Sequence, residues 1–146
     1  MLKLTKKADY GLIALRHLAL NQEGASVKEI AGSYGIPMPL LAKVLQKLAR
    51  GGLLAAEHGT NGGYRLARNA REISALEVIR TINGPILLTS CSTQRGECYQ
   101  SVTCSVREPL RKIHQGILQL LENTSISDLA QDTAAQPNEL AILKTL

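Results

Sequence analysis

The three cysteines of this 146-residue chain all lie in one short stretch, CSTQRGECYQSVTC. Cys91, Cys98 and Cys104 are separated by six and then five residues, most of them polar. Buried thiols usually scatter over apolar positions, whereas thiolates gathered in one loop can surround a soft metal centre. An odd number of cysteines also prevents complete disulfide pairing within one chain. The stretch therefore indicates metal or redox chemistry.

Three kinds of chemistry remain open for this loop. Structural zinc usually has closely spaced cysteine pairs and a fourth ligand nearby, and the loop has neither such pairs nor a histidine. The wider spacing suits an iron–sulfur cluster, whose ligands surround a larger body. A cluster needs a fourth ligand from an Asp, Glu, His, small molecule or partner chain. The third possibility is a thiol redox switch without metal.

Composition and charge narrow the class of protein. Hydrophobic residues make up 45% of the chain, without Phe or Trp, so the core must be aliphatic, which suits packed helices. Residues 1–72 carry a net charge of +6 and residues 73–146 a net charge of −1, which suggests an anion-binding first half. No membrane span, signal peptide, C-x-x-C motif or nucleotide-binding glycine motif is found. We therefore expect a cytoplasmic protein that is not an enzyme, with no membrane partner and no small-molecule substrate.

The first half predicts three helices. Thr5 is a candidate N-cap for the first, which ends in residues 21–24. Ser26 and Glu29 have the spacing of a capping box for the second, which stops at Gly35. The third is predicted from Pro37 to Arg50. Two short helices joined by a glycine-containing turn indicate a helix-turn-helix.

A hairpin is predicted directly after the third helix. Leu53–His58 and Tyr64–Ala67 read as strands around a glycine-rich turn, which makes a winged helix. Ser74–Asn83 then predicts a fourth helix. The returning strand and the residues after it carry cations that could reach DNA phosphates: Arg65, Arg68 and Arg71.

The last long helix carries a narrow apolar seam formed by Val106, Leu110, Ile113, Ile117 and Leu120. Such a seam suits pairing with a second copy, or packing against the chain's own winged helix. We place the helix start at Pro109, since proline is tolerated at the first helical position. A short helix over Ser127–Gln131 and a polar tail from Asp132 follow. The expected organisation is a DNA-binding domain over 1–84, a cysteine loop over 85–105, a dimerisation region over 106–131 and a tail over 132–146.

The motifs LTKKADYGLIAL, HGTNGGYRLAR and ISALEVIRTING, together with the cysteine loop, resemble the bacterial Rrf-two transcription regulators, the group of IscR, NsrR and RirA. The opening and the cysteine block are most similar to the branch that regulates the Suf iron–sulfur assembly operon. The resemblance implies a mainly α fold, with a two-stranded wing and a long C-terminal dimerisation helix. It also implies a homodimer, a double-stranded DNA operator, and action as a repressor.

The resemblance carries a DNA-contacting surface onto this chain. Some relatives have Glu where Ala42 stands and Arg where His58 stands, so the operator need not match theirs. The residues implied to face DNA are Lys28, Pro37, Met38, Pro39, Leu40, Lys43, His58, Gly59, Thr60, Asn61 and Arg65.

The resemblance also implies that Cys91, Cys98 and Cys104 ligate the cluster. The histidine that IscR-like members supply as fourth ligand is replaced here by Arg107, which cannot bind iron. NsrR-like members use an Asp from the partner's first helix, and Asp9 stands at that place. This favours a 4Fe–4S cluster, with 2Fe–2S possible. Glu108 is a local rival ligand, and Asp9 also fits an ordinary acid in the first turn of a helix.

Overall fold

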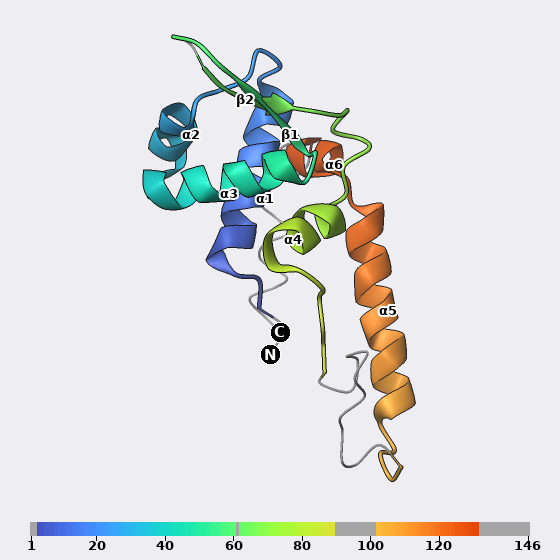
Figure 1. The fold of residues 1–146 in the computed structure, drawn as a ribbon. Helices are drawn as coiled ribbons and strands as arrows, with labels where there is room; N and C mark the ends of the chain where they lie inside the picture. Colours follow the sequence, from blue (N-terminus) through green and yellow to red (C-terminus); the bar gives the residue numbers. More distant parts are fainter. Residues whose placement is uncertain (1–2, 61, 90–101, 132–146) are drawn as a thin grey trace, which may run out of the picture.

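The computed structural model describes residues 3–60, 62–89 and 102–131, so Asn61, Cys91, Cys98 and the tail from Asp132 lie outside the described residues. The described residues form helices and one two-stranded antiparallel sheet (Figure 1). The predicted mainly α winged-helix fold is confirmed. The elements are α1 (Lys6–Leu20), α2 (Val27–Tyr34), α3 (Met38–Arg50), β1 (Leu54–Glu57), β2 (Gly63–Leu66), α4 (Ala75–Asn83), α5 (Arg107–Asn123) and α6 (Ile126–Gln131).

The core is aliphatic, as predicted, and lies between α1, α3 and α4. Leu15 of α1 and Leu45 of α3 are fully buried, and Ile126 of α6 closes the same cluster. Gly11 lets α1 approach α4 closely, because a Cβ there would lie 2.3 Å from the Cδ1 of Ile82. Burial of these side chains is the main force that holds the helices together.

Both predicted N-caps are present. The Thr5 hydroxyl accepts a hydrogen bond from the Ala8 N–H at 3.1 Å. The Ser26 N–H donates to Glu29 Oε2 at 2.6 Å, and the Glu29 N–H donates to Ser26 Oγ at 3.1 Å, which completes the capping box. The pattern fixes where α1 and α2 begin.

The turn between α2 and α3 depends on Gly35, which has φ +63°. The N–H groups of Gly35 and Ile36 both donate to the Ala31 carbonyl, and Ile36 is buried. A left-handed glycine with these bonds is the usual way to stop a helix sharply. The next helix begins at Met38, with Pro37 as its N-cap, one residue later than predicted.

The wing is attached to the helix-turn-helix by an isolated backbone bridge, in addition to the pairing of its two strands. Leu54 pairs with Leu66 and Glu57 with Gly63, so each strand differs by about one residue from the prediction. Ala25, just before α2, also exchanges two backbone hydrogen bonds with Tyr64, at 3.0 and 2.9 Å. This bridge sets the position of the hairpin relative to α2.

The predicted start of α5 at Pro109 is wrong, because the helix begins at Arg107. Proline is tolerated at the third position, since the first four N–H groups of a helix have no partner within it. None of the residues of α5 is fully buried, although the helix is 17 residues long. The following short helix is confirmed one residue earlier, from Ile126, and Ser125 and Asp128 cap it.

Candidate nucleic-acid interface and cysteine region

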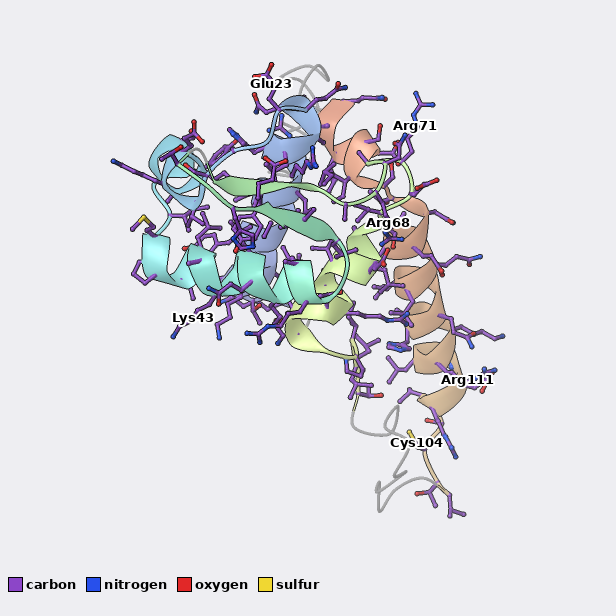
Figure 2. The ribbon with its side chains drawn as sticks, turned by 45° about the horizontal axis from the view of Figure 1, so that its top comes forward. Glu23, Lys43, Arg68, Arg71, Cys104 and Arg111 are labelled. Carbon is purple, nitrogen blue, oxygen red and sulfur yellow. The ribbon has the colours of Figure 1, made fainter. Side chains whose placement is uncertain are left out.

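The exposed start of α3 lies on the same side of the molecule as α2 and the tip of the β1–β2 hairpin (Figure 1). Pro37, Met38, Pro39 and Lys43 are exposed there, and Leu40 is half-buried. Lys43 points outward from α3, away from the hairpin (Figure 2). The residues of α3 that were predicted to contact DNA therefore lie together at one accessible helix end. A helix end of this kind can enter the major groove of DNA.

The other predicted DNA contacts lie on α2 and the wing. Lys28 on α2 is exposed, as are His58, Gly59 and Thr60 at the hairpin tip. Arg65 differs from the expectation of a free cation, because its Nε lies 3.0 Å from Glu57 Oε1 across the hairpin. The Arg65 side chain is 58% exposed and that of Glu57 is 39% exposed, so solvent weakens this ion pair.

The two cations that follow the wing differ, because Arg68 is held in an ion pair and Arg71 points outward. Arg68 forms an ion pair with Glu77 on α4, which ties the end of the hairpin to that helix. Arg71 is exposed and points outward near α6 (Figure 2). A third cation, Arg16 of α1, donates a hydrogen bond from its Nε to the Leu129 carbonyl at 3.1 Å and so connects α1 to α6.

Sequence reasoning missed two exposed polar residues on α3. Gln46 and Arg50 are exposed and follow Pro39 and Lys43 at helical spacing. The helical spacing of Leu41, Val44, Leu45 and Leu48, the buried residues of α3, leaves both residues on the opposite face and could have identified them. Gln46 and Arg50 extend the polar face of α3 beyond the exposed start of the helix.

The start of α5 and the end of the cysteine stretch lie far from the exposed start of α3 (Figure 2). Cys104 is half-buried and has a free thiol. Glu108, the rival ligand, accepts from Arg111 Nε at 3.0 Å, and this hydrogen bond holds the pKa of its carboxyl below the ordinary value. Glu108 would have to leave this partner in order to bind iron.

Asp9 is half-buried in the first turn of α1. Across residues 3–60, 62–89 and 102–131, no three His, Cys, Asp or Glu side chains come together in a way that could hold a metal ion. Two of the three cysteines lie outside these ranges, so the predicted ligand set stays a prediction. His17 of α1 contacts α2, because its Nδ1 lies 2.9 Å from the Tyr34 hydroxyl.

An apolar cavity of about 340 Å³ separates the start of the chain from α4 and α5. It lies where the chain leaves α4 towards the cysteine stretch. Ile117 and Leu121 line it from α5, so part of the predicted seam packs back on the winged helix. The cavity is lined by Lys3, Leu4, Ile79, Asn83, Pro85, Ile86, Leu87, Ile117 and Leu121.

The sequence profile of Rrf2, described as an iron-dependent transcriptional regulator, matches residues 4–132. The chain belongs to the Rrf2 family. This confirms the resemblance to the Rrf-two regulators. Members of the Rrf2 family are transcription regulators that bind DNA and act as dimers. Within the part of the Rrf2 protein that the structure describes, no helix has both the length and the apolarity to cross a bilayer.

Three solved structures are similar to this Rrf2 protein. CymR (YrzC), the global cysteine regulator of B. subtilis, is 28% identical with a TM-score of 0.72, over 89% of this chain and 97% of that one. IscR of T. potens is 27% identical with a TM-score of 0.73, over 92% of each chain. A transcriptional regulator from Listeria innocua is 30% identical with a TM-score of 0.72, over 87% of this chain and 85% of that one.

Proposed function

We propose that this Rrf2 protein is a homodimeric, DNA-binding repressor that senses an iron–sulfur cluster and controls Suf-type cluster assembly genes. The observation that carries the proposal is the gathering of all three cysteines in one stretch that ends just before α5. The iron-dependent description of the family and the likeness to IscR of T. potens support it. The exposed start of α3, at the other end of the molecule, supports the reading role.

The donor chemistry suits a cluster. Cys104 has a free, half-buried thiol, so its sulfur is available as a ligand for iron. Cys91, Cys98 and Cys104 would supply three ligands, and Asp9 of the partner subunit the fourth, which favours 4Fe–4S. A bound cluster supplies an iron- and oxidant-sensitive link between its ligands. With Asp9 as a ligand, the start of α1 in one subunit would be held against the cysteine stretch of the other.

A stripe on α5 supports the homodimer. Ile113 and Leu120 are 53% and 68% exposed, and Gly116 between them is also exposed. The three positions lie on one face of the helix, because their spacings are three and four residues. A Cβ at Gly116 would contact nothing within 4 Å in this chain, so the glycine leaves room for a partner helix. The stripe fits the same surface of a second copy.

The DNA-contacting role rests on shape and charge. The start of α3 would enter the major groove and the hairpin tip would lie along the neighbouring backbone or minor groove. Lys28, Lys43 and Arg65 would contact phosphates, so affinity is expected to fall steeply as salt rises. Two half-sites about one helical turn apart would be bound only when both α3 helices are correctly placed. A change in the dimer therefore alters operator affinity.

The test is anaerobic purification with absorbance spectra and iron and sulfide counts. The wild type is expected to be brown, with about four irons per chain, and Cys104→Ser and Asp9→Ala to lose most of them. Glu108→Ala serves as the matched control and is expected to keep its iron. A brown Asp9→Ala with a colourless Glu108→Ala would move the fourth ligand to Glu108. A colourless wild type that takes up no iron and sulfide would overturn the cluster proposal.

A second candidate is a cluster-free Rrf2 regulator that uses a thiol switch or a structural zinc. The likeness to CymR, the global cysteine regulator of B. subtilis, favours it. The same preparation separates the candidates. Zinc without colour supports a zinc-stabilised dimer, whereas a metal-free protein whose DNA affinity changes with thiol oxidation supports the switch.

A further inference from the structure

The first turn of α3 exposes apolar side chains, whereas the recognition helix of a DNA-binding protein usually offers hydrogen-bonding groups at this position. Pro37, Met38 and Pro39 are all exposed, and Met38 is 51% exposed. The core does not need these side chains, because α3 packs through Leu41 and Leu45, which are buried further along the helix. Three consecutive exposed apolar side chains at the end of a helix proposed to bind DNA point to an apolar partner.

The backbone at the same helix end is unsuited to binding phosphate. Pro39 has no N–H, and the N–H groups of Leu40 and Leu41 both donate to the Pro37 carbonyl, at 3.1 and 3.0 Å. The N-cap offers no side-chain hydrogen bond. A helix start that binds anions needs a row of outward N–H groups, and most of that row is missing here. The backbone of the first turn therefore offers no ready phosphate-binding site.

The side chains around this turn limit which bases it can read. A carboxylate reads the cytosine amino group and an amide reads adenine, but Ala42 offers neither. Lys43 lies one turn beyond Pro39 and is the nearest exposed cation on α3, which suits guanine or a phosphate. The thymine methyl group is the one major-groove feature recognised by apolar contact.

Resting on the proposed DNA-binding function, we infer that Met38, with the rings of Pro37 and Pro39, reads thymine methyl groups in the major groove. Each half-site then contains thymine beneath the first turn of α3, flanked by the base pair or phosphate that Lys43 meets. Removing one buried methyl group costs about 0.8 kcal/mol, which is about fourfold in affinity.

The experiment starts from a pool of random-sequence DNA duplexes, because the operator is not identified. Full-length protein, both as purified anaerobically and after metal removal, is used to select the duplexes that bind. Thymines in the selected half-sites are then replaced by deoxyuridine, which removes only the methyl group. Deoxyuridine placed between the half-sites is the matched control. We expect about a fourfold loss of affinity per critical thymine and no loss for the control.

Variants of Met38 tie the effect to this residue. In Met38→Ala the ratio of thymine to deoxyuridine affinity is expected to fall towards one, whereas Met38→Leu should keep it. Selected sites that bind equally well with deoxyuridine would overturn the inference and leave DNA binding intact. An unchanged ratio in Met38→Ala would also overturn it. Failure to select any sequence would contradict the proposed function itself, so the two failures are distinguishable.

Discussion

The Lys47 ammonium group, on α3, donates a hydrogen bond to the backbone carbonyl of Ile82 at 2.8 Å. The carbonyl belongs to the last turn of α4, where a cation also interacts favourably with the helix dipole. One residue further on, Asn83 Oδ1 accepts a hydrogen bond from the Thr5 hydroxyl at 2.9 Å. The end of α4 therefore contacts both α3 and the start of α1, just before the chain leaves for the cysteine stretch.

This position predicts that Lys47 couples the cysteine region to α3. We expect Lys47→Met to reduce the ratio of operator affinities between the iron-loaded and metal-free protein by about 0.5–2 kcal/mol, because the tether that orients α3 on α4 is lost. Fluorescence anisotropy with a selected duplex measures both affinities. Lys43→Met is the matched control and should weaken both states equally, because Lys43 points outward. Equal weakening by Lys47→Met would assign Lys47 a DNA contact instead.

The close approach of Gly63 to Ala25 makes a second prediction. A Cβ at Gly63 would lie 2.5 Å from the Ala25 carbonyl oxygen, so the bridge that holds the wing must shift. We expect Gly63→Ala to weaken DNA binding at least tenfold and to lower the free energy of unfolding by about 1–3 kcal/mol. Anisotropy and urea unfolding provide the two values.

Gly32 provides the control for that substitution. It lies inside α2, and a Cβ there would meet nothing within 4 Å. Gly32→Ala should raise stability by up to about 1 kcal/mol, because alanine favours the helix, and leave DNA affinity unchanged. Equal DNA affinities for the Gly63→Ala and Gly32→Ala proteins would show that the wing position does not matter for binding.

Two helix caps predict a loss of stability in acid. A hydrogen bond from the Ser26 backbone N–H holds the pKa of Glu29 below its ordinary value, and one from the Ser125 backbone N–H does the same for the pKa of Asp128. A carboxyl with a lowered folded-state pKa stabilises the fold above its unfolded pKa, and this contribution disappears as pH falls through the folded pKa. Stability should therefore drop as the pH decreases below about 4.5.

Urea unfolding of the metal-free protein from about pH 7 to about pH 3 tests this. Glu29→Gln should be less stable than wild type at neutral pH, and the difference should close in acid, because only the wild type loses a charged cap. Glu23→Gln changes an exposed carboxyl in the turn before α2 and serves as the control. A difference between Glu29→Gln and wild type that does not depend on pH would contradict the capping explanation.

Local patterns predicted the helix starts well. Thr5 and Ser26 cap through residues three positions away, so their partners are visible in the sequence. Pro109 misled the prediction because a rule about where proline is preferred was used to exclude the third position, where it is also tolerated. The cap formed by Ser125 and Asp128 has the same local spacing and could have been found.

Contacts between distant segments could not be predicted in the same way. The pairing of Arg65 with Glu57 depends on the hairpin register, and the bond from Lys47 to Ile82 joins residues 35 positions apart. The cysteine types and spacing indicated the chemistry of the candidate site. The placement of its ligands depends on tertiary packing, and for Asp9 on a second subunit, which no periodicity within one chain encodes.

The exposed stripe on α5 predicts the effect of a charge at Leu120. This side chain is 68% exposed in one chain, so Leu120→Lys should fold normally, yet a dimer through the stripe would bury the added ammonium without a partner. We expect the variant to be monomeric at micromolar concentration and to bind a two-half-site duplex at least tenfold more weakly. Sedimentation velocity and anisotropy measure the two effects. Leu20→Lys, at an apolar residue of α1 that is 56% exposed, is the control and should stay dimeric. A dimeric Leu120→Lys protein with wild-type operator affinity would place the dimer interface elsewhere on the molecule.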